Sequence, residues 1–340
     1  KEDEMVMEEA TIVTGYGVTH HESAKFKLHS GMRSRGGAMP LAYTQNTEEY
    51  NKFAANRFLP ALNEPLSTFS IDVDNAAYSN VRRFINQGTF PPVDAIRTEE
   101  FLNYFTYNYP APQEKDPVSI TTEVSNAPWN TQHKLVHIGI KAKEVSTDNL
   151  PASNLVFLID VSGSMSDANK LPLLKSSLKL LVKQLRPQDR VAIVTYANHT
   201  KEVLASTPGS DKAKILDAID GLYASGGTAG GDGIQRAYRV AESNFTKGGN
   251  NRIILATDGD FNIGISSPRE LEKMIETKRT SGIYLTVLGF GMGNYKDNRM
   301  QVLAEKGNGN HAYIDNLTEA KKVLVNEFGG TLFTVAKDVK

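Results

Sequence analysis

Five side chains with oxygen donors stand out at three separate places in the sequence. An apolar run ends in Asp160, and two hydroxyl residues, Ser162 and Ser164, follow at every second position. A lone Thr228 lies in a glycine-rich stretch, and Asp258 ends a second apolar run. Carboxylates and hydroxyls are hard oxygen donors, the ligands that Mg²⁺, Mn²⁺ and Ca²⁺ prefer. One carboxylate and two hydroxyls are too few to hold such a cation, so the chemistry depends on a fold that unites all three places.

The elements that must position these side chains alternate between strands and helices from residue 155 onward. Strands are expected at 155–160, 190–197, 202–205, 252–258, 283–290 and 311–314. Alternation with short loops predicts an α/β fold, a Rossmann-like, doubly wound, mostly parallel sheet with helices on both faces. The segment 202–205 follows a tight turn and is expected to be a short antiparallel edge strand. Ligands of such sheets bind beyond the carboxyl ends of the strands, where the strand order reverses.

The rest of the chain divides into segments of different character. Residues 1–65 are weakly patterned and predict an extended or partly disordered arm. Residues 66–150 predict a small α+β N-terminal subdomain of two helices and an antiparallel strand pair. Its loop residue Trp129, the only tryptophan, is expected to fill a core rather than to bind a ligand. The main domain is expected at 151–335.

Composition excludes several classes of function. The chain of 340 residues has 38 Lys+Arg against 39 Asp+Glu, so no strong field marks a nucleic-acid partner. It has no cysteine, which excludes disulfides, zinc–thiolate sites and cysteine nucleophiles. No apolar run is long enough to predict a transmembrane segment. The chain begins with Lys1 in a polar stretch without a signal-peptide core, and we interpret it as a processed or trimmed product.

The five oxygen donors together resemble a known pattern. Asp160-x-Ser162-x-Ser164, Thr228 in its glycine-rich loop and Asp258 in Thr-Asp-Gly resemble the metal-ion-dependent adhesion site (MIDAS) of von Willebrand factor type A domains. The resemblance covers about residues 150–335 and includes every ligand position in the same order. It implies that the two serines and the threonine bind the metal directly, and that the aspartates bind it directly or through water. It also implies an open coordination position for an exposed Asp or Glu of a protein partner.

The nature of the ligands bears on which ion is bound. Compact ligands with retained waters favour Mg²⁺, and Mn²⁺ or Ca²⁺ are alternatives.

Residues 66–150 resemble the region that precedes the type A domain in a bacterial extracytoplasmic, often lipid-anchored branch of the family. This resemblance implies the cell envelope, either the periplasm or the outer membrane or surface, with a lipid anchor upstream of this chain. In that branch a β-rich segment follows, so residues 336–340 are expected to begin a C-terminal segment.

Two other functions compete with a non-enzymatic binding module. The first is a Mg²⁺-dependent, phosphatase-like hydrolase with Asp160 as nucleophile. Ser162 stands where such an enzyme has a second aspartate, and no Lys or His is in an obvious supporting role, so we expect no catalytic residues. The second is a structural module whose metal only stabilises the loops.

Two neighbouring features are expected to lie near the metal without binding it. The carboxylate of Asp232 is expected to stabilise the first turn of its helix through the helix dipole rather than to bind metal. Gly289–Gly293 is expected to form a loop beside the metal.

Overall fold

The computed structural model describes residues 47–52, 56–68, 74–113, 115–143, 150–228, 233–259 and 268–327. The expected arm up to residue 46, Asp232 and residues 336–340 lie outside these ranges. No helix in the described part of the chain is long and apolar enough to cross a membrane.

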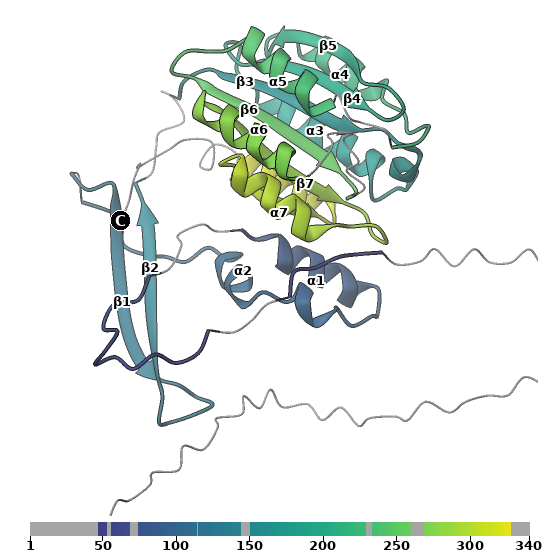
Figure 1. Cartoon of the computed structure of the whole chain (residues 1–340). Coiled ribbons are helices and arrows are strands. Elements are labelled where there is room, and N and C mark those ends of the chain that lie inside the picture. Colours follow the sequence, from purple (N-terminus) through teal and green to yellow (C-terminus); the bar gives the residue numbers. More distant parts are fainter. Residues whose placement is uncertain are drawn as a thin grey trace, which may run out of the picture. The chain divides into compact units, whose positions relative to one another are not determined.

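A six-stranded sheet forms the centre of the structure (Figure 1). Its strands in chain order are β3 (Ser153–Asp160), β4 (Arg190–Tyr196), β5 (Lys201–Pro208), β6 (Asn250–Thr257), β7 (Ile283–Phe290) and β8 (His311–Ile314). Their order in space is β5-β4-β3-β6-β7-β8, and every pair is parallel except β4 with β5. The predicted parallel sheet and its antiparallel edge strand are therefore confirmed. The strand order reverses between β3 and β6, the two strands that lead to Asp160 and Asp258.

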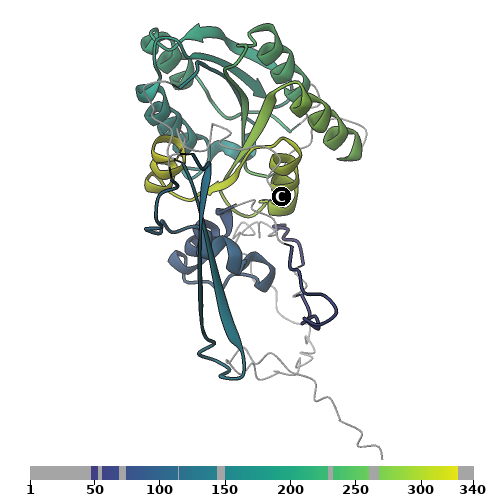
Figure 2. The same ribbon diagram turned by 90° about the vertical axis from the view of Figure 1, so that its left-hand side faces the viewer.

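Helices cover both faces of this sheet, as Figures 1 and 2 show. One face carries α3 (Leu171–Gln184), α4 (Lys212–Asp220) and α8 (Leu317–Lys321), which continues into a π-helical turn at Lys322–Asn326. The other carries α5 (Gly233–Ser243), α6 (Pro268–Thr280) and α7 (Asp297–Lys306).

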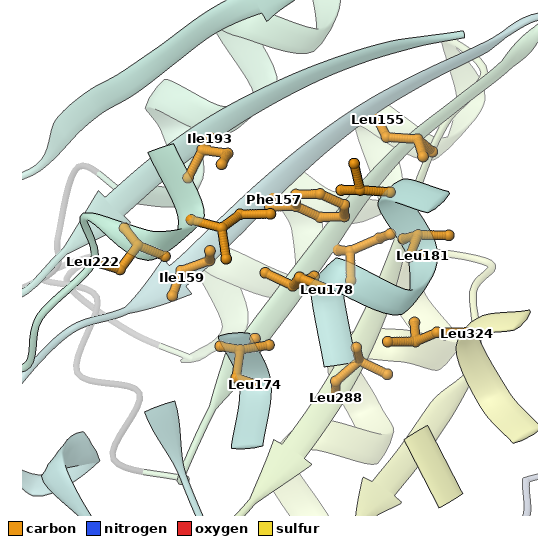
Figure 3. Close-up of a cluster of buried hydrophobic side chains, with 14 of the residues drawn as sticks. Leu155, Phe157, Ile159, Leu174, Leu178, Leu181, Ile193, Leu222, Leu288 and Leu324 are labelled. Atoms are coloured by element: carbon orange, nitrogen blue, oxygen red, sulfur yellow. The ribbon is translucent and has the colours of Figure 1, made fainter. Parts of the chain in front are cut away.

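The unbroken apolar run of β3 is explained by these two layers. Leu155, Phe157 and Ile159 pack against the layer that contains α3 (Figure 3). Val156 and Leu158, which alternate with them, pack against the layer that contains α5. All five side chains are at most 1% exposed. Each position of the run Leu155–Ile159 faces one of the two layers, so the first polar side chain after this run, Asp160, marks the carboxyl end of the strand.

The described N-terminal elements are two helices, a short 3₁₀ turn and a hairpin. They are α1 (Ala76–Asn86), the 3₁₀ turn Val93–Ala95, α2 (Thr98–Asn103), β1 (Val118–Asn126) and β2 (Lys134–Ala142). The strands pair antiparallel, as predicted. The expectation for Trp129 was wrong, because this residue lies in the hairpin turn and is 74% exposed.

One buried ion pair joins the N-terminal elements to the sheet domain, and two further buried pairs lie within the N-terminal part. Arg97 Nη2 lies 2.6 Å from Asp297 Oδ2, and its Nη1 lies 2.9 Å from Glu100 Oε1. Arg83 pairs with Glu48 at 2.8 Å, and Glu48 Oε1 also accepts a hydrogen bond from Gly293 N at 2.8 Å. Residues around Glu48 thus contact the loop that follows β7, which adjoins the candidate site.

Candidate metal site

Asp160 is the last residue of β3, and its carboxylate is completely buried. Its Oδ1 accepts a hydrogen bond from Ser162 N at 2.9 Å. Its Oδ2 accepts from Tyr196 Oη at 3.1 Å and from Thr257 Oγ1 at 3.2 Å. Burial and the charge of Asp258 raise the pKa of Asp160 and hydrogen bonds from Ser162 and Tyr196 lower it, with a net pKa of about 6. The carboxylate is therefore positioned by three neighbours and lacks a cationic partner among them.

The two serines lie in the turn that follows β3. Ser162 Oγ lies 3.0 Å from Ser164 Oγ, so the two hydroxyls converge. The chain forms a 3₁₀ turn at Gly163–Ser166, and Met165 within it is fully buried in the core beneath α3. The buried side chain of Met165 therefore anchors the turn to the core, and the hydroxyls of Ser162 and Ser164 lie at the carboxyl end of β3. Ser162 is 1% exposed, whereas Ser164 is exposed.

Asp258 follows β6, the neighbour of β3, and it is also completely buried. Burial raises the pKa of its carboxyl, but hydrogen bonds from Asn294, Lys170 and Ser164 and the charge of Lys170 lower it below its ordinary value. Lys170 Nζ lies 2.9 Å from Asp258 Oδ2. The two aspartates of the site therefore have opposite shifts, because only Asp258 has a buried cation beside it.

Thr228 belongs to a loop that is fastened to the serine turn by its backbone. Gly163 N donates to Gly226 O at 2.8 Å, and Ser225 N donates to Val161 O at 2.8 Å. Thr228 is two residues beyond Gly226 and is half-buried. The loop thus lies beside Ser162 and Ser164, and a direct bond from the Thr228 hydroxyl to a metal remains a prediction.

The structure unites the predicted residues at one edge of the sheet. Asp160, Ser162, Ser164 and Asp258 are linked by hydrogen bonds and by the mutual effect of the carboxylates, and the Thr228 loop adjoins them. The donors are carboxylate and hydroxyl oxygens only, which is the chemistry of a Mg²⁺, Mn²⁺ or Ca²⁺ site. The residues present therefore fit a divalent cation of this type.

Sequence reasoning missed four further residues of the site. They are Lys170, Asn294, Tyr196 and Thr257. No lysine was obvious beside the site in the sequence, and the structure places Lys170 against Asp258. Only its place at the start of a helix, directly after the serine turn, was visible in the sequence. Gly289 and Phe290 still belong to β7, so only Gly291–Gly293 of the expected loop is a loop; it lies beside the site, since Asn294 follows it.

Comparison with known proteins gives the family. Residues 154–326 match the family model described as von Willebrand factor type A domain, and residues 44–137 match one described as von Willebrand factor. The chain belongs to the von Willebrand factor type A domain family, whose members bind a divalent cation at a MIDAS and are known for metal-dependent protein interaction.

Two bacterial relatives and one solved structure illustrate the likeness. The chain is 50% identical over 301 residues to the uncharacterized protein YfbK of Escherichia coli, covering 86% of this chain and 52% of that protein. It is 30% identical to the uncharacterized protein sll0103 of Synechocystis, covering 56% of this chain and 44% of that protein. The chain thus spans about half the length of these relatives. Proximal thread matrix protein 1 of the mussel byssus, with zinc in its MIDAS motif, is 23% identical with a TM-score of 0.43, covering 53% of this chain and 46% of that one.

Proposed function

We propose that this chain is a metal-dependent protein-binding module. Asp160, Ser162, Ser164, Thr228 and Asp258 would hold a divalent cation, with Mg²⁺ as the physiological ion. A carboxylate from an Asp or Glu of a partner protein would complete the coordination. The observation that carries this proposal is the convergence of two buried carboxylates and a pair of hydroxyls at the point where the strand order reverses.

The charge and coordination of the site favour an acidic partner. The five proposed ligands are two carboxylates and three neutral hydroxyls, so a six-coordinate divalent cation keeps a coordination position for another oxygen donor. The cation itself would supply the Lewis acidity that binds the partner's carboxylate. The residues of this chain orient the cation, because hydrogen bonds from Ser162 N, Tyr196 and Thr257 fix the Asp160 carboxylate.

Isothermal titration calorimetry tests the metal site. We expect wild-type protein to bind Mg²⁺ or Mn²⁺ at one site and Asp160→Ala to lose this binding. Asp211→Ala is the matched control, since Asp211 is an exposed aspartate that precedes α4. Equal metal binding by wild type and Asp160→Ala would refute the proposal.

Partner binding needs a separate test. Immobilised protein is incubated with an envelope extract of the source cells in Mg²⁺ or in EDTA. We expect the wild-type protein to retain a partner in Mg²⁺ and to release it in EDTA. The Asp160→Ala protein is expected not to retain this partner. Replacement of the partner's own contacting Asp or Glu is expected to abolish its binding to the wild-type protein. A partner that binds equally in EDTA would contradict a role for the metal. For a purely structural metal, Thr228→Ala would lower the melting temperature and leave this binding intact.

One observation keeps a hydrolase as the second candidate. Lys170 gives the site a cation of its own, which phosphoryl-transfer sites use to neutralise charge. It contacts Asp258 rather than Asp160, however, and Ser162 occupies the position of a second acid. Hydrolysis of p-nitrophenyl phosphate with Mg²⁺ is expected to be absent; turnover that Asp160→Asn abolishes would reverse the choice between the two functions.

The cell-envelope location is part of the same proposal. It is supported by the resemblance of residues 66–150 to the bacterial extracytoplasmic branch of the family. Fractionation of the source cells with an antibody against this chain tests it. We expect the signal in the envelope fraction, and a purely cytoplasmic signal would contradict the location.

A further inference from the structure

Lys170 is a buried cation next to one of the proposed metal ligands. Its Nζ lies 2.9 Å from Asp258 Oδ2 and 3.2 Å from Asn294 Oδ1, and its side chain is 5% exposed. Asp167 Oδ2 is 3.9 Å from the same nitrogen, but Asp167 is 69% exposed, so solvent screens its charge. The ammonium group therefore acts mainly on the metal site.

The aliphatic part of Lys170 is confined by the loop after β7. A Cβ atom at Gly291 would come within 2.3–2.8 Å of Cε, Cγ and Cδ of Lys170, so only a glycine leaves room for the lysine there. Gly291 also has a φ of +76°, a conformation that favours glycine. Its carbonyl oxygen accepts a hydrogen bond from the Tyr313 hydroxyl, which fixes the loop against β8. Lys170 is thus held in place and is not a mobile surface side chain.

The loop itself is braced from a distant part of the sequence. Gly293 N donates to Glu48 Oε1 at 2.8 Å, and Glu48 forms a buried ion pair with Arg83 of α1. Thr47 N also donates to Gly293 O at 2.7 Å. These contacts hold the loop that confines Lys170, so the lysine keeps its place beside Asp258.

The charges of the site follow from these contacts. Asp160 and Asp258 contribute two negative charges and Lys170 one positive charge, all three within the buried site. A divalent cation added to this set leaves a net charge of one positive unit. Without Lys170 the same cation would be neutralised completely, and a further anion would gain less by binding.

We propose that Lys170 sets the charge of the metal centre, weakening its hold on the cation and strengthening its attraction for an anionic group of a partner. The inference rests on the proposed function of the site as a metal centre. The ammonium repels the cation and attracts the incoming carboxylate, and both effects are strong because buried charges are screened much less than exposed ones. Metal affinity and carboxylate affinity are therefore expected to change in opposite directions when this charge is removed.

The test uses Mn²⁺ as the metal and acetate as the carboxylate. Mn²⁺ affinity is measured by electron paramagnetic resonance of the free ion, and acetate affinity by the water-proton relaxation of Mn²⁺-loaded protein. For Lys170→Met we expect Mn²⁺ binding at least tenfold tighter and acetate binding at least threefold weaker. Lys170→Gln, whose amide can still donate to Asp258, is expected to give the same two shifts, which separates the charge from the hydrogen bond.

Lys183→Met is the matched control. It removes one lysine charge from the exposed side of α3, the helix that Lys170 directly precedes, 13 positions further along, which is about 20 Å at the rise of an α-helix. We expect both affinities of this variant to equal those of wild type. Thermal melts followed by circular dichroism verify that each variant is folded.

The outcomes separate the inference from the proposed function. If wild type binds Mn²⁺ and both Lys170 variants are folded with unchanged or weaker Mn²⁺ affinity, the inference is wrong and the metal site stands. Tighter Mn²⁺ binding with unchanged acetate affinity would also overturn the inference, because the charge of Lys170 would then have no effect on anion binding to the metal-loaded site. If wild type binds no Mn²⁺, the proposed function fails and the inference fails with it.

Discussion

His311 makes the stability of this fold depend on pH in a direction that the structure defines. It begins β8 and is buried, with Nε2 3.0 Å from the Tyr295 hydroxyl. Burial lowers the pKa of His311, the charge of Glu100 raises it and that of Arg97 lowers it, with a net pKa of about 4. Its Nδ1 has no hydrogen-bond partner among the described residues. The folded protein therefore keeps this imidazole neutral down to acidic pH.

The unfolded chain binds a proton at His311 near the ordinary pKa of about 6.5. Below that pH the unfolded state carries the proton and the folded state does not, so the free energy of unfolding falls as the pH falls. The loss begins near pH 6.5 and is complete below the folded pKa of about 4. Each pH unit in this window is worth about 1.4 kcal/mol, so the loss between pH 7.5 and pH 4.5 is about 2.5 kcal/mol.

Asp160 acts in the opposite direction over nearly the same window. Because its pKa is raised to about 6, the folded state binds that proton more readily than the unfolded state, and stability rises as the pH falls. The two effects largely cancel in the wild type. The contribution of His311 is therefore measured as a difference between wild type and His311→Gln, in which the Asp160 effect is common to both proteins.

Urea denaturation at pH 7.5 and pH 4.5 measures this difference. We expect the unfolding free energy of wild type, minus that of His311→Gln, to be lower at pH 4.5 by about 2.5 kcal/mol. His199→Gln is the control, since His199 is exposed, and its difference from wild type should be within about 0.5 kcal/mol at both pH values. A His311 difference that does not change with pH would refute the assignment of this residue as a buried neutral histidine.

Three further predictions concern the core, the buried ion pairs and the hairpin. Phe157→Ala is expected to lower the unfolding free energy by about 3–5 kcal/mol in urea denaturation, because the ring is 1% exposed and packs beneath α3. Arg97→Ala is expected to cost about 3–5 kcal/mol by the same assay, because it leaves Asp297 and Glu100 buried without their cation; a loss below about 1 kcal/mol would contradict a buried pair. Trp129 is expected to show the red-shifted fluorescence of an indole in water and ready quenching by acrylamide, since it is 74% exposed; blue-shifted, protected emission would contradict that exposure.

The hairpin that carries Trp129 shows why the sequence pattern alone wrongly predicted which side chains are buried. One face of the strand pair is apolar, with Ile120 opposite Ile140 and Val124 opposite Val136. Such alternation predicts a strand with one buried face, and the strands are present. Yet these four side chains are 40–65% exposed in the structure. Periodicity gives the direction of a side chain, but only the tertiary arrangement decides whether another layer covers it.

The sequence by itself determined the sheet and the nature of the candidate site. Strands that are apolar throughout must be covered on both faces, so Leu155–Ile159 already required helices above and below the sheet. The first polar residue after such a strand lies at its carboxyl end, and this places Asp160 and Asp258 at one edge. The oxygen chemistry of Ser162 and Ser164 then indicated a hard cation.

Only the tertiary structure decided the charge of that edge. Lys170 is close to Asp258 because the loop around Gly291 leaves it room, and residues far apart in the sequence build that contact. The raised pKa of Asp160 and the lowered pKa of Asp258 likewise depend on neighbours from other strands and loops. Spacing along the chain predicts which oxygens can meet, but electrostatic effects act through space, so the balance between two carboxylates and one ammonium could be found only in the folded protein.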